Sequence, residues 1–429
     1  MSGLLTPYKP SAAPWDEARA ASFLRRTSFC PSEREIRDAV SAGFGATLEN
    51  LFAKRDCRDH NELDELGSPL ALRENIEALR GWWLRRLALT ARPLSGRLAV
   101  FWHNHFATSH VKVRSAPMML QQLRTIERHA FGPFEEMLIA ISRDPAMIVW
   151  LDNDDNVKGR PNENYAREVF ELFSLGLGAY AEHDIREGAR AFTGWSQKNG
   201  RYRFNRGEHD YGSKEVLGSR GDFDGDDVVR IAIAQPACAS FIATKLLREF
   251  VCPAPDTELV DAVAEQLRSS RFEIQTTLRA IFGSDMFVNA PRDTPRIKSP
   301  VEFVIGVVRS LEIDAAAQQL SEATSQMGQR LFEPPSVKGW DGHRRWLNSA
   351  TMLVRLNGVT SAVKSDRFQP SRLRSEYDLT TPDAVDAWCQ RVTVGPDTRI
   401  DLPPAPDDLD ERMKDRLRFL LSAPEYQLA

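Results

Sequence analysis

Histidines and carboxylates that could hold a metal ion occur in three separate segments of the chain. His103 and His105 form a His-x-His pair, Glu163 and Glu168 lie in an acidic segment, and His209 follows in a glycine-rich stretch. Neutral imidazoles together with a carboxylate suit divalent iron, zinc, copper or manganese. If these segments meet in the fold, the three histidines and a carboxylate, Glu163 or Glu168, would ligate a divalent metal ion. The other carboxylate could then act as a general base.

The His-x-His pair places a condition on the backbone around it. Residues i and i+2 of a regular α-helix point about 200° apart. His103 and His105 can therefore share one metal ion only if the helix ends or unwinds there, and the polar residues 108–110 permit such an end. The alternative is that both histidines are polar caps at the end of a helix.

An unusually polar helix is predicted over residues 161–176. It begins with Pro-Asn, which suits a first turn, and Gly176 suits the left-handed residue that ends a helix. Asn164, Glu168 and Glu171 fall on one side of it, at i, i+4 and i+7. Two carboxylates on one strip repel each other unless a metal ion or arginines neutralise them. A network of arginine–carboxylate pairs or a solvated face is the alternative to a functional centre.

Two arginines belong with these carboxylates as candidate catalytic residues. Arg167 lies inside the acidic helix between Glu163 and Glu168, and Arg190 lies in the next predicted helix. They could neutralise the carboxylates or bind an anionic ligand. Glu187 and Arg190, at i and i+3, can also pair within their own helix, and such structural pairing is the interpretation that we favour for Arg190.

Two loops could add further ligands. Residues 152–163 place acids or amides at positions one, three and five and Glu163 at position twelve, as in a calcium-binding loop. Val157 stands where that loop requires glycine, so a looser oxygen site or a polar turn before the next helix is favoured. In residues 336–348, Trp340 and Trp346 accompany several cations. This loop either lines the wall of a pocket or is held in place by its tryptophans.

Bulk composition describes an ordinary globular chain. Its 429 residues carry a net charge of −4, which gives no electrostatic argument for binding nucleic acid or an anionic membrane. No apolar run is long enough to predict a membrane span, and the first residues do not resemble a secretory signal. The five cysteines lack metal-site spacing and predict neither disulfides nor a zinc site. A cytoplasmic location is the simplest expectation.

Helical periodicity dominates the chain and predicts a mainly α fold. We expect one large irregular helical domain over residues 1–365, with a loop or hairpin insertion at about 197–226, where glycines and aromatic residues interrupt the pattern. A Pro- and Asp-rich segment and a last helix, residues 366–429, would pack on this core. Strands and helices do not alternate, which argues against a parallel sheet.

The same segments resemble the bacterial family known as domain of unknown function 1800. The resemblance runs through residues 24–26, 101–109, 151–176, 180–195, 209–218, 298–304, 335–348 and 422–428. It implies a predominantly helical protein and supplies no settled biochemical activity. Members of that family often accompany a sulfatase-like partner, domain of unknown function 1501, which bears a twin-arginine export signal. The resemblance therefore implies either a cytoplasmic protein or one exported while bound to such a partner.

Two functions follow as competing hypotheses. The first is a metal-dependent enzyme, a hydrolase or an oxidoreductase, with the polar His/Glu centre described above. The second is a non-catalytic partner, or a maturation or export companion, of the sulfatase-like protein. A metal-free enzyme is a third reading. The first hypothesis requires the imidazoles of His103, His105 and His209 to converge beside Glu163 or Glu168 in an open pocket.

Overall fold

The fold is mainly helical, as predicted from the sequence. The computed structural model describes residues 3–53, 63–289, 296–396, 398 and 400–428. The first half contains α1 (Glu17–Thr27), α2 (Glu33–Phe52), α4 (Gly67–Leu72), α5 (Ile76–Leu89), α6 (Pro93–His105), α7 (His110–Val113), α8 (Ala116–His129), α9 (Phe134–Ser142), α10 (Pro145–Trp150), α11 (Asn164–Glu168) and α12 (Glu182–Ala191). The second half contains α13 (Gly225–Ala234), α14 (Pro236–Phe250), α15 (Thr257–Ser269), α16 (Ile274–Phe282), α17 (Asp285–Val288), α18 (Pro300–Ser310), α19 (Ala317–Gln326), α20 (Ser349–Val363), α21 (Pro370–Tyr377), α22 (Pro382–Thr393) and α23 (Leu409–Ser422).

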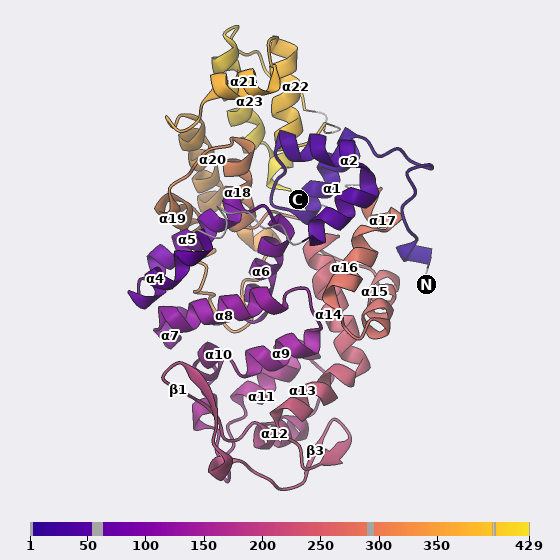
Figure 1. The fold of residues 1–429 in the computed structure, drawn as a ribbon, viewed down its shortest axis with the longest axis vertical. Coiled ribbons are helices and arrows are strands. Elements are labelled where there is room, and N and C mark those ends of the chain that lie inside the picture. The colour runs from indigo at the N-terminus through magenta and orange to yellow at the C-terminus, as the bar shows by residue number, and fades with distance from the viewer. Residues whose placement is uncertain (1–2, 54–62, 290–295, 397, 399, 429) are drawn as a thin grey trace.

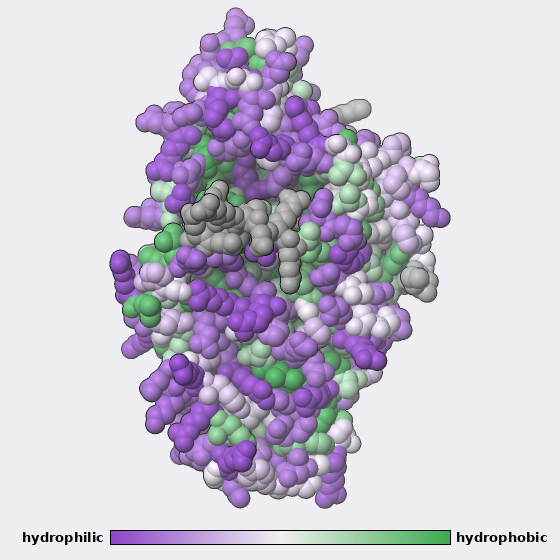
Figure 2. Space-filling view, in the orientation of Figure 1, coloured by the Kyte–Doolittle hydropathy of each residue, from purple (hydrophilic) through white to green (hydrophobic). Residues whose placement is uncertain are grey.

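The helices form an elongated body with α6 and α8 near its middle (Figure 1). The C-terminal helices α21 to α23 form the upper end in this view, and α12 lies near the lower end beside the strands. The space-filling view shows mostly hydrophilic residues over this face, with apolar residues in small groups (Figure 2). Small apolar groups of this kind are normal on a protein surface.

Helix α6 passes through the hydrophobic core. Trp102 is fully buried, its ring lies 5.8 Å from that of Phe134, and its indole N–H donates to the carbonyl of Ala130 at 3.1 Å. Phe106, which follows the helix, is equally buried. This packing fixes the rotation of α6 about its axis, and therefore the directions in which its polar side chains point.

The insertion predicted at 197–226 is confirmed and contains two antiparallel hairpins. Strand β1 (Trp195–Lys198) pairs with β2 (Arg201–Phe204), and β3 (Lys214–Val216) pairs with β4 (Ser219–Gly221). The two sheets do not share a strand. The insertion thus adds short ribbons to a helical body.

The polar helix predicted over 161–176 has a different geometry from the one expected. Its α-helical part is only α11, and a π-helix, η3 (Val169–Ser174), follows it directly. Gly176 adopts a φ of +81°, as expected for the residue that ends the segment. The wider turn of the π-helix changes the register after Glu168, so Glu171 no longer follows the spacing of a single α-helix.

The C-terminal segment is more helical than expected. The sequence predicted a Pro- and Asp-rich segment followed by one last helix, but α21 and α22 also lie within residues 366–429. Pro370 and Pro382 each occupy the first turn of a helix, where the missing N–H costs nothing. The prolines here begin helices. The division into residues 1–365 and 366–429 stays a prediction.

No single helix within the described residues is long and apolar enough to cross a membrane. Helices α13 and α14 are long and apolar enough only when taken together, and a bend of 78° separates them. Their apolar residues are largely buried inside the fold. The cysteines within the described residues are unpaired thiols, and Cys57 lies outside those residues.

Candidate functional site

A cavity of about 460 Å³ lies where four segments distant in sequence meet. The C-terminal half of α6, the end of α14, residues 296–302 at the start of α18, and the loop 338–346 form its walls. Aromatic side chains contribute apolar surface, among them Phe101, Trp340 and Trp346. Apolar walls with a few polar groups are typical of small-molecule sites, which makes this cavity the candidate site.

Two of the cavity's cations belong to a buried ion-pair network. Arg97 on α6 contacts Glu249 and Glu302, each at 3.1 Å, and Arg296 donates to Glu302 at 2.7 Å. Burial acts to raise the pKa of Glu302, but the guanidinium groups of Arg296 and Arg97 outweigh burial and hold that pKa well below its usual range. The Glu302 carboxylate also accepts the N–H of Ser299, which fixes the start of α18. These charges satisfy one another and form the structural part of the wall.

Three other cations of the cavity have no such partner. Lys245 and Arg248 lie one turn apart on α14, and Lys338 lies in the 338–346 loop. Their side chains form no ion pair or hydrogen bond with any residue that the structure describes. Many arginines among the described residues pair with carboxylates, as Arg167, Arg190 and Arg412 do, whereas these three cations of one cavity do not.

Each polar side chain of the His-Asn-His segment binds the main chain of a different segment. The Nε2 of His103 accepts the N–H of Phe332 at 3.1 Å. The Oδ1 of Asn104 accepts the N–H of Trp340 at 2.7 Å. The Nε2 of His105 lies 3.1 Å from the carbonyl of Phe173, in the π-helix. The two histidines therefore diverge, because α6 remains helical through residue 105.

Both histidines of this segment are buried and neutral. Burial lowers the pKa of His103 to about 3. Burial, and then the charge of Lys245, lowers the pKa of His105 well below its usual value. Because the Nε2 of His105 faces a carbonyl oxygen, it carries the proton and Nδ1 is an acceptor. This Nδ1 is buried without a hydrogen-bond partner among the described residues, and His105 lines the cavity.

The acidic helix lies beside the cavity, and most of its charges are paired. Arg167 binds Glu182 at 2.9 Å and Glu163 at 3.2 Å. Glu168 is half-buried and forms no ion pair with the part of the chain that is described. Burial and the nearby Glu171 raise the pKa of Glu168, whereas Arg167 and Lys338 lower it. Lys338 thus lines the cavity and also lowers the pKa of Glu168.

His209 and Arg190 hold the hairpin insertion together at another place. The Nδ1–H of His209 donates to the carbonyl of Thr193 at 2.9 Å. Arg190 binds Asp210 at 2.8 Å and Glu187 at 2.7 Å. The hydrogen bond from Arg190 is the main reason that the pKa of Asp210 falls to about 2. Arg190 pairs with these acids and not with Glu168 or Glu171.

The predicted metal ligands are therefore not brought together. His103, His105 and His209 each bind a different carbonyl or amide, and Glu163 binds Arg167. Within residues 3–53, 63–289 and 296–428, apart from 397 and 399, no group of three or more His, Cys, Asp or Glu side chains could hold a metal ion. The loop at 152–163 is a polar turn, in which Asn162 Oδ1 accepts the N–H of Asn164 at 3.0 Å. Of the predicted metal ligands, only His105 reaches the cavity.

One wall of the cavity was among the predictions from the sequence, and another was not. Of the two interpretations of residues 336–348, the pocket wall is the one that the structure supports, because Lys338, Trp340 and Trp346 line the cavity. Lys245 and Arg248 were not predicted to line a cavity, because charges near the end of an amphipathic helix usually face solvent. Their spacing of one turn on the polar side of α14 is visible in the sequence. The sequence does not show that this side of the helix faces a cavity.

Three of the segments that carry the family resemblance line this cavity. Residues 101–109, 298–304 and 335–348 all contribute to its walls. A family described as "Protein of unknown function (DUF1800)" matches residues 22–428 of the chain. Neither the curated proteins nor the solved structures gave a match.

Proposed function

We propose, for a chain that belongs to the DUF1800 family, that the cavity binds a small molecule with an anionic group and is the place where the protein acts. The observation that supports this proposal is the set of three unpaired cations, Lys245, Arg248 and Lys338, around one cavity of about 460 Å³. Lys245 is half-buried and Arg248 and Lys338 are exposed, and like charges that line one cavity repel each other. A bound carboxylate, phosphate or sulfate would remove this repulsion.

The rest of the wall fits a ligand of moderate size. The rings of Phe101, Trp340 and Trp346 can cover a carbon skeleton. The unpaired Nδ1 of His105 can accept a hydrogen bond from a hydroxyl or amino group of that skeleton. The carboxylates of Glu249 and Glu302 are held by Arg97 and Arg296, so they leave the three unpaired cations available to an anion.

Calorimetric titration of the full-length protein with inorganic phosphate, sulfate and citrate tests this proposal. We expect at least one of these anions to bind and to raise the melting temperature. Arg248→Gln and Lys338→Gln should each weaken that binding by about tenfold, since a charge-assisted hydrogen bond contributes roughly 1.5–3 kcal/mol.

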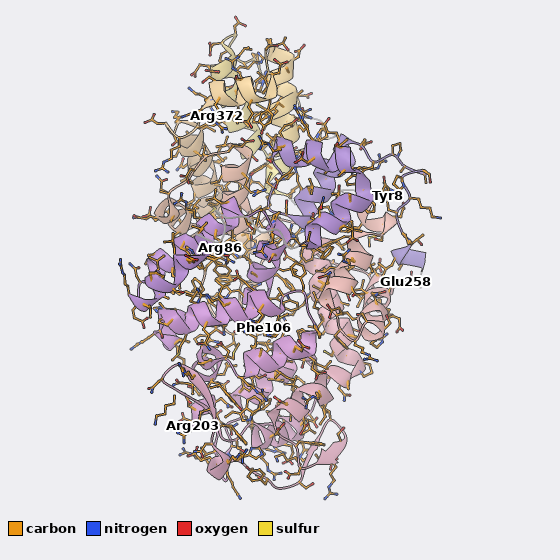
Figure 3. All side chains as sticks on the ribbon, viewed as in Figure 1. Tyr8, Arg86, Phe106, Arg203, Glu258 and Arg372 are labelled. Atoms are coloured by element: carbon orange, nitrogen blue, oxygen red, sulfur yellow. The ribbon has the colours of Figure 1, made fainter. Side chains whose placement is uncertain are left out.

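Arg203→Gln is the matched control. Arg203 is an exposed arginine of β2, at the lower end of the molecule and away from Phe106, which follows His105 (Figure 3). This substitution removes the same charge from the protein and should leave anion affinity unchanged within about twofold. Equal losses in Arg203→Gln and Arg248→Gln, or no binding of any of the anions, would contradict the proposal.

The two functions predicted from the sequence stay predictions. A metal-dependent enzyme would require stoichiometric metal in the purified protein, which elemental analysis measures. A companion of a sulfatase-like protein would require that the two proteins co-purify, and the location of the protein, cytoplasmic or exported, would follow from its partner. Anion binding is compatible with either of them and is measured independently.

A further inference from the structure

Lys245, which is half-buried, differs from the two paired arginines of the cavity wall. Arg97 and Arg296 both contact carboxylates, whereas the Lys245 ammonium has no anion beside it in the part of the chain that is described. Its Nζ lies 4.8 Å from the centre of the Phe241 ring, one turn earlier on α14. Arg248, one turn later on the same helix, brings a second positive charge.

The groups that face Lys245 from other elements do not compensate for this charge. His105, on α6, is neutral. Lys338, on the 338–346 loop, is a further cation of the cavity. Of the carboxylates that line the cavity, Glu249, on α14 itself, and Glu302 are engaged by Arg97 and Arg296, and Asp341 pairs with Arg345. A lysine that is desolvated and placed next to another cation is favoured in its neutral form, and the neutral amine is a nucleophile.

The electrostatic environment supports this reading. Burial, and then the charge of Arg248, lowers the pKa of Lys245 to about 8. At pH 7.5 about a quarter of such amines are neutral, compared with roughly 0.1% of amines at an ordinary lysine pKa of about 10.4. The amine would be available for reaction at neutral pH without any change in the fold.

We propose that Lys245 is a nucleophile that forms an imine with a carbonyl compound bearing an anionic group. This inference rests on the proposed function, because Arg248 and Lys338 would hold the anionic group. The neutral amine nitrogen adds to the carbonyl carbon, and the resulting carbinolamine loses water. One C=N bond replaces one C=O bond, the oxygen leaves as water, and no oxidant or reductant is consumed.

Reductive trapping on the full-length protein tests the reactivity of this amine. The protein is treated with propanal, a neutral aldehyde, or with glyoxylate, a carboxylate-bearing aldehyde, together with cyanoborohydride. Peptide mass mapping then gives the labelling rate of each lysine. With propanal we expect Lys245 to be labelled at least about tenfold faster than Lys338, in the same cavity, and Lys158, on the exposed surface. With glyoxylate that advantage should grow several-fold, and inorganic phosphate should reduce it.

Two variants separate electrostatics from binding. Arg248→Gln should slow the labelling of Lys245 by propanal several-fold, because loss of the neighbouring charge raises the pKa of the amine. Propanal has no anionic group for Arg248 to hold, so this change reports electrostatics and not binding. Arg203→Gln should leave that rate unchanged. If propanal labels Lys245 no faster than Lys158 while wild-type protein still binds phosphate, the nucleophile inference is overturned and the anion site stands. If Lys245 reacts rapidly but glyoxylate has no advantage and phosphate does not bind, the proposed anion function fails.

Discussion

Asp144 is a buried carboxyl group through which the stability of the fold should depend on pH. It caps α10, where its Oδ1 accepts the N–H of Met147 at 3.1 Å and the amide of Gln122 at 3.0 Å. Its Oδ2 is buried without a partner among the described residues. Burial raises the pKa of Asp144 to about 7 in the folded protein. An unfolded chain releases this proton near pH 4, so the contribution of Asp144 to stability falls as pH rises from about 4 to 7 and is constant above that.

Asp144→Asn should remove this dependence. The amide keeps an acceptor for the helix cap and never becomes charged. We expect the variant to be more stable than wild type at pH 8, by about 2–4 kcal/mol, and nearly equal to it at pH 4. Urea unfolding at the two pH values measures this difference. Asp256→Asn is the control, because Asp256 caps α15 from an exposed position. A similar pH-dependent gain in both variants would assign the effect to the cap itself.

Single residues also show how far sequence reasoning reaches. The sequence predicted that His103 and His105 would diverge if α6 stayed helical, and the structure shows that divergence. It could not show that Asn104, between them, would hold the main chain of Trp340, because that contact joins residues 236 positions apart. Buried polar side chains form hydrogen bonds with the main-chain groups that lie next to them in the fold. The spacing of residues in the sequence does not predict which groups those are.

Among the structural elements, the loop 338–346 depends on close contact with the end of α6. Gly339 has a φ of +77°, and a Cβ at this position would collide with the side chain and carbonyl of Asn104. Gly339→Ala should therefore push the loop away from α6 and move Lys338 and Trp340. We expect anion affinity to fall by about tenfold or more, as measured by phosphate titration, because Lys338 would lose its position at the cavity.

Gly328→Ala is the matched control for this loop. Gly328 has a φ of +92°, so alanine meets similar backbone strain there, but no atom lies within 4 Å of the added Cβ. Both variants should lose about 1–3 kcal/mol of stability from the left-handed backbone. Only Gly339→Ala should lose anion affinity. Equal affinities in the two variants would show that the loop does not need its contact with Asn104.

The elements that were missed have two different physical causes. A π-helix differs from an α-helix by the width of one turn, and that turn depends on tertiary contacts such as the one between His105 and the carbonyl of Phe173. Helices α21 and α22 were not predicted, because prolines such as Pro370 and Pro382 usually interrupt helices. Each of these two prolines instead lies in the first turn of a helix. Amphipathic helices such as α15 follow the local helical periodicity from which the mainly α fold was predicted correctly.

For the whole molecule, the cavity depends on both ends of the chain. Arg97 donates from the cavity wall to the carbonyls of Arg26 and Ser28, at 2.8 and 2.9 Å, near α1. At the other end, the N–H of Lys298 donates to the carbonyl of Gln427 at 2.8 Å, and its ammonium lies 3.6 Å from the centre of the Tyr426 ring. Local sequence patterns could not predict these contacts, since each joins residues at least 69 positions apart.

Tyr426→Ala should loosen the wall formed by residues 296–302. Tyr426 is fully buried, and its ring packs against Phe303 at 5.6 Å between centroids. Its removal should cost about 3–5 kcal/mol of stability, measured by urea unfolding, and should weaken phosphate binding. Phe419→Ala, a truncation of a ring on α23 that is 37% exposed, should cost less than about 1 kcal/mol. Comparable losses in the two variants would contradict the role given to Tyr426.

The contact between residues 297–298 and 427–428 has a consequence during synthesis on the ribosome. A nascent chain that is arrested just before Tyr426 already contains Lys245, Arg248 and Lys338. It still lacks the residues that anchor one side of the pocket. Ligand capture would therefore be expected only after residues 426–428 have been translated, and it would distinguish chains that include these residues from chains released before them.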